Sequence, residues 1–421
     1  MKAHLRKQVV ILGGGFAGLS AALQLANEPG FRRDYNVTLV DKNCYHLYHG
    51  LLYEVATAHF EIRPQDIQYL QGGVCIRLKA LGELVTKRQI DFMQATVTGI
   101  DRQRQRVLCG HEPDFGYDHL VIALGSEPTD YGIAGLREHS VSLRDIPDAL
   151  AIRDKVRLLI AKSNQSPGTT RQIIVAGGGF TGVEFAGELL EYIRRLVRQR
   201  VIAPNAIGVT IVEASDALLK SLGADVSRAA QQRLARLGAR FELGAPIARI
   251  GNQAVQLPDG RAIPFDLLVW SGGIQANRLL KSFDIPTVGR GQVAVEPTLR
   301  VKGSENLWAA GDCVMFIDPA TGKPIPQVAP LASDAGRQVA KNVARSINGL
   351  PLLPWQPRHF GFVVPVGGKF AIARTRLLHG QGLIAWILRR LIDLNYFMSI
   401  MSFRKALRVF IRGARVYLKN D

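Results

Sequence analysis

Two sets of three glycines lie where a short apolar segment gives way to a segment with helical character. The sets are Gly13, Gly15 and Gly18 near the start of the chain and Gly177, Gly179 and Gly182 near its middle. In dinucleotide-binding turns, glycines at this spacing permit a sharp turn, admit a pyrophosphate and let the helix pack against the strand. The helix N-terminus then attracts the phosphates. Each set therefore predicts one bound dinucleotide, and the alternative is a purely structural turn.

An acidic residue ends the strand that is expected after each glycine set. These residues are Asp41 in the first half and Glu213 in the second. A carboxylate at this position accepts hydrogen bonds from ribose hydroxyls. Glu213 would repel a 2′-phosphate, and the following Ala214 and Ser215 supply no arginine, so the second site is expected to prefer NADH over NADPH. The alternative for Glu213 is a solvated strand end.

Both glycine sets belong to stretches in which expected strands and helices alternate. Strand-like segments that end just before Gly125 and Gly273 close the two stretches, and each of these glycines is expected to face a cofactor. This internal duplication predicts an α/β fold with two Rossmann-like dinucleotide-binding domains. Two dinucleotides in one chain indicate a flavoprotein that takes electrons from a nicotinamide. The expected parts are a discontinuous first domain (1–135 and 286–350), a second domain (136–285) and a C-terminal region (351–421).

A third strand-to-glycine turn follows the second domain. The segment 306–314 contains Gly311 and Asp312 and leads to a helix expected over about 331–347. We expect this segment to return to the first domain and Asp312 to start a helix that faces the phosphate or ribityl oxygens of a flavin. The alternative for Asp312 is a plain helix N-cap.

Composition and charge bound the partners of the chain. It has 421 residues, 47% hydrophobic and 21% charged, and a formal net charge of +18. This charge favours nucleic acid, a membrane surface or an acidic protein as partner. The basic residues form no nucleic-acid-binding motif, so no nucleic acid is expected, although a non-enzymatic dinucleotide sensor is an alternative. The four cysteines form no close pair, which predicts neither a metal site nor a redox dithiol.

The tail combines an apolar segment with a basic one. Residues 383–401 are strongly apolar, but Arg389, Arg390 and Asp393 interrupt them, and such charges make a membrane span too costly. Over 404–419, basic residues recur every three or four positions opposite apolar ones, as in an amphipathic membrane-associating helix on an anionic membrane. The alternative is a helix packed in an oligomer or core. The expected location is the cytoplasmic side of the membrane, bound peripherally, because the first strand starts too early to follow a signal peptide.

These segments together resemble the type II NADH dehydrogenases, single-chain FAD enzymes that reduce a membrane quinone without pumping protons. The resemblance is carried by the amphipathic tail and by residues 46–58, 177–189, 270–273 and 310–313. It implies FAD in the first domain, NADH in the second and hydride transfer from the nicotinamide to the flavin. It also implies that Glu184 lies near the nicotinamide as a catalytic residue and helps to orient it.

The sequence departs from the family pattern where the quinone would bind. Pro330, Asp334 and Ala335 replace the usual glutamines, and Gly50 and Glu54 stand where Pro and Gln are usual. The quinone is then expected to be a different one or to be held by other groups. The candidates are His46, Tyr48, His49 and Lys369. The alternative acceptor is a small redox protein, and the formation of a homodimer stays open.

Overall fold

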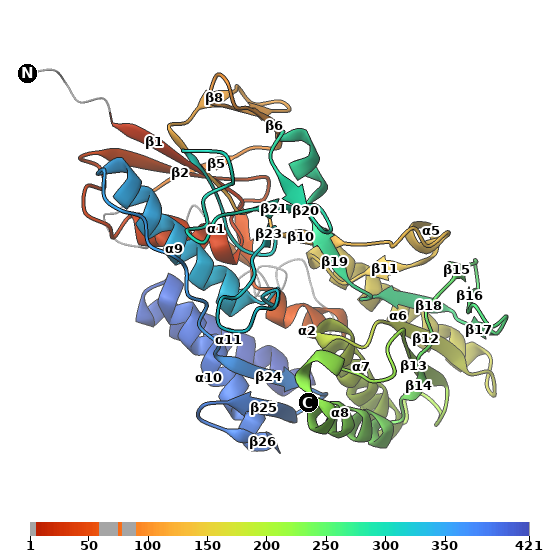
Figure 1. Cartoon of the computed structure of the whole chain (residues 1–421). Helices are drawn as coiled ribbons and strands as arrows, with labels where there is room; N and C mark the ends of the chain where they lie inside the picture. Colours follow the sequence, from red (N-terminus) through yellow and green to blue (C-terminus); the bar gives the residue numbers. More distant parts are fainter. Residues whose placement is uncertain (1–5, 59–74, 78–89, 421) are drawn as a thin grey trace, which may run out of the picture.

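The computed structural model describes residues 6–58, 75–77 and 90–420, and the side chains of these residues except 75–77 and 412–420. Parts of the expected first domain, residues 59–74 and 78–89, lie outside the described residues. Two helix-covered sheets and a smaller C-terminal region make up the molecule (Figure 1).

The first sheet has five parallel strands in the order β22-β9-β1-β2-β5. Their bounds are Lys7–Leu12 (β1), Tyr35–Asp41 (β2), Asp91–Gln94 (β5), His119–Ile122 (β9) and Leu307–Ala309 (β22). The side chains of β1 from Val9 to Leu12 are buried, as expected for a parallel strand covered on both faces. Helix α1 (Phe16–Leu25) follows β1 and packs against α9 (Ala329–Ile347). The pairing of β22 with β9 returns the chain after residue 306 to the first sheet.

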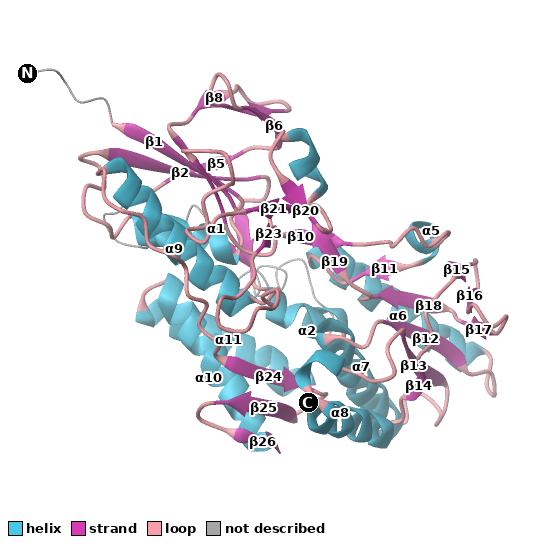
Figure 2. Ribbon diagram, in the orientation of Figure 1, coloured by secondary structure: helices cyan, strands magenta, loops and turns pink. Residues whose placement is uncertain are grey.

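The second sheet repeats this arrangement with the parallel order β11-β18-β12-β13-β14. Its strands are Val141–Ser142 (β11), Arg171–Ala176 (β12), Ile207–Glu213 (β13), Arg240–Leu243 (β14) and Leu267–Trp270 (β18). The helices α6 (Ile146–Gln165), α7 (Phe180–Arg198) and α8 (Ala224–Leu237) belong to this half, as Figure 2 shows. In each sheet, a glycine set follows the central strand, β1 or β12, and the neighbouring strand ends in Asp41 or Glu213. The α/β fold with two Rossmann-like halves is confirmed, whereas the exact domain boundaries stay predictions.

Short elements connect and flank the two sheets. The strands β10 (Ser126–Pro128) and β19 (Ile274–Ala276) form an antiparallel pair between the halves. The other short strands are Tyr45–Leu47 (β3), Cys75–Arg77 (β4), Val97–Asp101 (β6), Arg106–Cys109 (β7), Phe115–Gly116 (β8), Arg249–Ile250 (β15), Ala254–Gln256 (β16), Ala262–Pro264 (β17), Thr287–Val288 (β20), Gln292–Ala294 (β21) and Val314–Met315 (β23). The short helices are His49–Leu51 (η1), Leu52–Ala56 (α2), Leu136–His139 (α5), Lys220–Leu222 (η2) and Arg278–Ser282 (η3).

The C-terminal region bridges the two halves. It consists of a sheet, β24 (Gly361–Pro365), β25 (Ala371–Thr375) and β26 (His379–Gly382), and two helices, α10 (Leu383–Ile400) and α11 (Phe403–Asn420). The turn after β24 packs closely against α7 of the second half. A Cβ atom added to Gly187 of α7 would lie only 2.6 Å from the backbone nitrogen of Gly367 in this turn. On the other side, α10 bonds to the first half through Tyr396 and His46. Within the parts of the chain that the structure describes, no helix combines the length and apolar character needed to cross a membrane.

Candidate functional site

The first glycine of each set shapes a sharp turn between strand and helix. Gly13 has a φ of +105° and Gly177 a φ of +113°, in the left-handed region that side chains rarely adopt. A Cβ on Gly13 would lie 2.4 Å from the carbonyl oxygen of Ala123, and one on Gly177 would lie 2.5 Å from that of Ser271. Both turns therefore require glycine at this position.

The other two glycines of each set provide close packing and open space. A Cβ on Gly18 or Gly182 would lie 1.9 Å from the carbonyl oxygen of the first glycine of its set. At Gly15 and Gly179, by contrast, no described atom lies within 4 Å of the added Cβ. These two residues immediately precede α1 and α7, and no described side chain caps either helix. Uncapped N–H groups beside open space suit a pyrophosphate, so the residues present fit one dinucleotide at each turn.

The two acids bind their glycine turns in the same way. Asp41 Oδ2 accepts a hydrogen bond from the N–H of Gly14 at 2.6 Å, and Glu213 Oε2 accepts one from that of Gly178 at 2.5 Å. The other carboxylate oxygen of each accepts a bond at 2.7 Å from the N–H two residues further along. Burial raises the pKa of Asp41, although these N–H groups oppose the rise. Glu213 is thus bonded to the turn and is no free strand end, while its contact with a ribose stays a prediction.

The other three predicted glycines also have positive φ values. Gly125 has a φ of +66° with open space around its added Cβ in the described structure. Gly273 has a φ of +141°, and a Cβ there would lie 2.3 Å from the hydroxyl oxygen of Tyr131. Gly311 has a φ of +84° and would contact the Cβ of Ala17 at 2.9 Å. The positive φ values explain why glycine is present at all three positions, and the contacts of these glycines with cofactors stay predictions.

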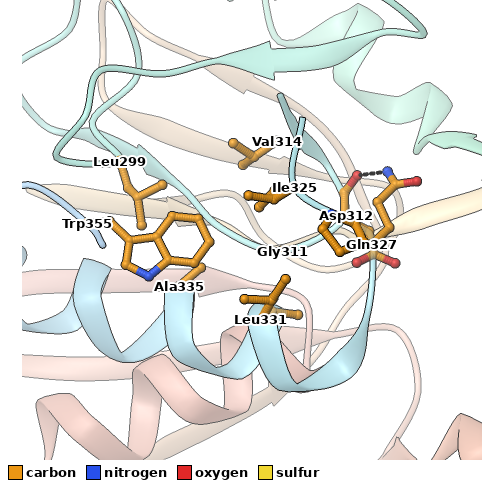
Figure 3. A pocket seen from close by; sticks show the side chains of 11 residues that line it. Leu299, Gly311, Asp312, Val314, Ile325, Gln327, Leu331, Ala335 and Trp355 are labelled. Atoms are coloured by element: carbon orange, nitrogen blue, oxygen red, sulfur yellow. Dashed lines mark hydrogen bonds between the residues drawn. The ribbon is translucent and has the colours of Figure 1, made fainter. Parts of the chain in front are cut away.

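Asp312 lies in a turn after β22, beside a small cavity (Figure 3). The expected helix start and the N-cap alternative at this residue are both wrong, because α9 begins only at Ala329. Its carboxylate accepts a hydrogen bond from Ser126 Oγ at 3.1 Å, and burial raises the pKa of this carboxyl. Its backbone oxygen accepts one from Gln327 Nε2 at 2.7 Å. The cavity has a volume of about 10 Å³, which is room for about one water molecule.

Of the residues that replace the family's glutamines, Asp334 makes internal hydrogen bonds. Asp334 accepts a hydrogen bond from Trp355 Nε1 at 2.9 Å and one from Arg337 at 3.4 Å. Ala335 is buried, and Pro330 is exposed at the start of α9. Asp334 therefore connects the chain after α9 to that helix.

Two of the four side chains suggested as replacement quinone contacts make internal hydrogen bonds. His46 bonds to the Gly14 carbonyl oxygen at 2.8 Å and to the Tyr396 hydroxyl at 2.7 Å. Tyr48 donates to Asp393 at 2.5 Å. His49 and Lys369 are exposed. Two of the four candidates are thus committed to internal hydrogen bonds.

A buried set of charges, not predicted from the sequence, lies where α10 meets α2 of the first half of the molecule. We call Glu54, Arg389, Arg390 and Asp393 the α10 ion cluster. Arg390 pairs with Glu54 at 2.7 Å and with Asp393 at 3.3 Å, and Arg389 makes a shorter ion pair with Asp393. Arg389 also donates to the carbonyl oxygen of Gly50 at 3.1 Å. The close spacing of Arg389, Arg390 and Asp393 in an apolar helix indicates that these charges pair with one another, but it does not predict their partners elsewhere in the chain.

Glu184 lies on α7 near this cluster. Desolvation raises the pKa of Glu184 to about 7, the nearby Arg389 and Arg390 oppose the rise, and Asp393 and Glu54 add to it. Glu184 makes no ion pair with any described residue within 4.0 Å. A carboxyl with this pKa changes its protonation near neutral pH.

Comparison with known proteins supports the resemblance noted in the sequence. Residues 7–336 match the family model described as pyridine nucleotide-disulphide oxidoreductase. The chain is 29% identical over 402 residues to the type II NADH:quinone oxidoreductase of Staphylococcus saprophyticus, covering 93% of this chain and 95% of that protein. It is 30% identical over 355 residues to the type II NADH:quinone oxidoreductase of Staphylococcus aureus, covering 82% and 84%.

Among solved structures, NDH2 from Plasmodium falciparum in complex with NADH shares the fold. The TM-score is 0.82 at 17% identity, over 99% of this chain and 98% of that one. The structural likeness thus extends through the C-terminal region, which lies beyond the family model. The chain belongs to the type II NADH:quinone oxidoreductases, within the pyridine nucleotide-disulphide oxidoreductase family.

Proposed function

We propose that the protein oxidises NADH through a bound FAD and delivers two electrons to a membrane quinone. The observation that carries this proposal is the pair of equivalent glycine turns, each open to a pyrophosphate and each bonded to a carboxylate, in a chain of this family. The overall reaction converts NADH, one proton and a quinone into NAD⁺ and a quinol.

The first turn would hold FAD and the second NADH. The proposed FAD residues are Gly13, Gly15, Gly18, Asp41, Gly125, Gly311 and Asp312. The proposed NADH residues are Gly177, Gly179, Gly182, Glu213 and Gly273. Bound FAD supplies a centre that accepts a hydride from NADH and passes the electrons on. The protein contributes open N–H groups for the phosphates and carboxylates for the riboses.

Glu184 is the catalytic residue of this proposal. Beside the nicotinamide it would orient the ring, and its pKa of about 7 lets it hold or release a proton at neutral pH. The reaction takes up one proton per NADH, so a half-buried carboxyl that exchanges a proton near neutral pH is useful. Desolvation is the main cause of this raised pKa, and within the α10 ion cluster Arg389 lowers it whereas Asp393 raises it.

The outer face of the C-terminal region supports a peripheral attachment to the membrane. Exposed apolar side chains on α10 are Leu383, Ile384, Ile387, Leu391, Ile392 and Met398. Leu377 before β26 is 88% exposed, and Phe403 at the start of α11 is 62% exposed. The cations Arg376, Arg404 and Arg408 are exposed beside them. An apolar face with cations at its edge fits an anionic leaflet, and we assign the protein to the cytoplasmic side. The basic residues beyond 411 fall outside the described side chains.

A reductase of a small redox protein is the second candidate function. The commitment of Asp334 to Trp355 favours it, since this position holds no amide for a quinone carbonyl. The exposed apolar face of α10 favours the quinone, because a water-soluble acidic partner would not need it.

Vesicles of anionic and of neutral lipid, each loaded with quinone, separate the two functions. The quinone proposal predicts that the protein floats with anionic vesicles and that NADH oxidation rises when the quinone is in them. A protein that stays in the supernatant at low salt and reduces only protein acceptors would contradict it. Sedimentation equilibrium in detergent distinguishes a monomer from the homodimer that the sequence leaves open.

A further inference from the structure

His46 links the first glycine turn to the C-terminal helix. It lies on β3 and is completely buried. Its Nδ1 bonds to the backbone carbonyl oxygen of Gly14 at 2.8 Å, and its Nε2 bonds to the hydroxyl of Tyr396 on α10 at 2.7 Å. The imidazole therefore joins Gly14 of the first glycine turn to Tyr396, which lies 350 positions after the histidine.

The chemistry of the partners fixes the position of the imidazole proton. A carbonyl oxygen only accepts hydrogen bonds, so the proton of the ring must lie on Nδ1. Burial lowers the pKa of His46 to about 4, and the nearby His49 adds to this effect, so the ring is neutral at pH 7. Nε2 then accepts, and Tyr396 donates. In this arrangement, the Gly14 carbonyl selects the tautomer, and the Tyr396 hydroxyl supplies the donor that the buried Nε2 of this tautomer needs.

Tyr396 is itself held firmly against the first half. Its ring stacks on that of Tyr48, with centroids 5.1 Å apart and an interplanar angle of 20°. Phe16, the first residue of α1, packs against the rings of both His46 and Tyr396, at 5.1 and 5.2 Å. One turn of α10 earlier, Asp393 accepts the hydrogen bond of Tyr48. The position of the Tyr396 hydroxyl therefore depends on the docking of α10.

We propose that Tyr396 and His46 are positioning residues for the FAD site. Through these two residues, helix α10 helps to hold the phosphate-binding turn in place. This proposal rests on the assignment of FAD to the first glycine turn in the proposed function. When α10 is docked, Nδ1–H of His46 orients the Gly14 carbonyl, and the N–H groups that follow in the turn stay directed toward the pyrophosphate. When the Tyr396 hydroxyl is lost, the buried Nε2 has lost its hydrogen-bond donor, the ring is held on one side only, and the hold on the turn weakens.

The test measures the release of FAD from the holoenzyme by the rise in flavin fluorescence after dilution. Tyr396→Phe and His46→Ala are each expected to accelerate release about tenfold, the factor that corresponds to about 1.4 kcal/mol, typical of one buried hydrogen bond. His46→Asn is expected to release FAD at nearly the wild-type rate. The side-chain N–H of asparagine can replace Nδ1–H, and asparagine has no atom equivalent to Nε2 that needs the Tyr396 hydroxyl. Ser399→Ala is the matched control, since Ser399 Oγ donates only within α10, to the carbonyl oxygen of Tyr396.

The double variant decides whether the effect passes through the imidazole. In the His46→Asn background, Tyr396→Phe should add no further acceleration. An equal acceleration in both backgrounds, or wild-type release from the single Tyr396→Phe variant, would overturn the proposal. Spectra of ¹⁵N-histidine in the unmutated holoenzyme give an independent test if a variant does not fold: Nδ1 protonation of His46 is expected, and the opposite tautomer would also overturn it. Neither the FAD release rate nor the histidine spectrum involves NADH or quinone. Both results can therefore be interpreted even if the electron acceptor is not a quinone.

Discussion

The substitution Asp393→Asn tests whether the α10 ion cluster holds the C-terminal region on the first half of the molecule. Asp393 is 2% exposed. It accepts hydrogen bonds from Tyr48 at 2.5 Å, from Arg390 at 3.3 Å and, over a shorter distance, from Arg389. An amide keeps the shape of the side chain but removes its charge. Arg390 retains Glu54 at 2.7 Å, whereas Arg389 keeps no ion-pair partner at hydrogen-bonding distance among the described residues.

The expected loss follows from the burial of the charges left behind. Removing one partner of a buried ion pair costs about 3–5 kcal/mol. We expect the lower end because Glu54 still pairs with Arg390 and the Gly50 carbonyl still accepts from Arg389. About 3 kcal/mol corresponds to an increase of about a hundredfold in the population with α10 undocked. Hydrogen exchange of the amides in 383–400 measures this population directly when reclosing is fast.

The exposed ion pair between Asp225 and Arg374 provides a matched control. It also links the C-terminal region to the second half, at 2.5 Å, but the Asp225 side chain is 60% exposed, and exposed pairs contribute little. Asp225→Asn should therefore leave exchange in 383–400 unchanged. If Asp393→Asn changes exchange there by less than about threefold, the cluster does not hold the helix and the reasoning is refuted. A second readout is the pKa of Glu184, which should fall because the negative charge of Asp393 raises it.

Four further predictions concern the cofactors and the membrane. Gly177→Val should abolish flavin reduction by NADH while FAD stays bound, because its Cβ would meet the Ser271 oxygen at 2.5 Å; loss of FAD would reverse the assignment of the two turns. Glu213→Ala should narrow the preference for NADH over NADPH in initial-rate assays, and an unchanged ratio would remove Glu213 from the ribose site. Glu184→Gln should flatten the pH dependence of thermal stability. The folded pKa of Glu184 is raised to about 7, so its contribution to stability is complete below its unfolded pKa and is lost as the pH rises through 7. A variant whose stability declines with pH as the wild type does would contradict the raised pKa. Replacing Arg404 and Arg408 by Gln should weaken binding to anionic vesicles about thirtyfold, at about 1 kcal/mol per cation, with neutral vesicles as the control.

The sequence predicted the parts of the site that depend on local chemistry. The glycine spacing and the strand-ending acids Asp41 and Glu213 are set by a turn and its neighbouring strand, so short motifs were sufficient to predict them. The repetition of this unit also predicted the two halves, and β22 beside β9 agrees with the expected return of the chain to the first sheet.

The parts that the sequence did not predict depend on contacts between distant residues. Arg389, Arg390 and Asp393 were noticed only as charges that exclude a membrane span, because their partners Tyr48 and Glu54 lie more than 330 positions earlier. Asp312 was expected at a helix start, since nothing in the local pattern predicts the long turn segment before α9. The hydrogen bond between Asp334 and Trp355 forms only when the chain folds back on α9, so no local pattern around Asp334 predicts it.

The most direct test of the proposed reaction is an anaerobic stopped-flow measurement of the two half-reactions on the FAD-loaded protein. Mixing with NADH should bleach the flavin absorbance, and mixing the reduced protein with quinones of different head groups should restore it, faster than any small redox protein does. A flavin that NADH does not bleach would contradict the donor half of the account. A reduced flavin that no quinone reoxidises, but that a redox protein does, would contradict the acceptor half.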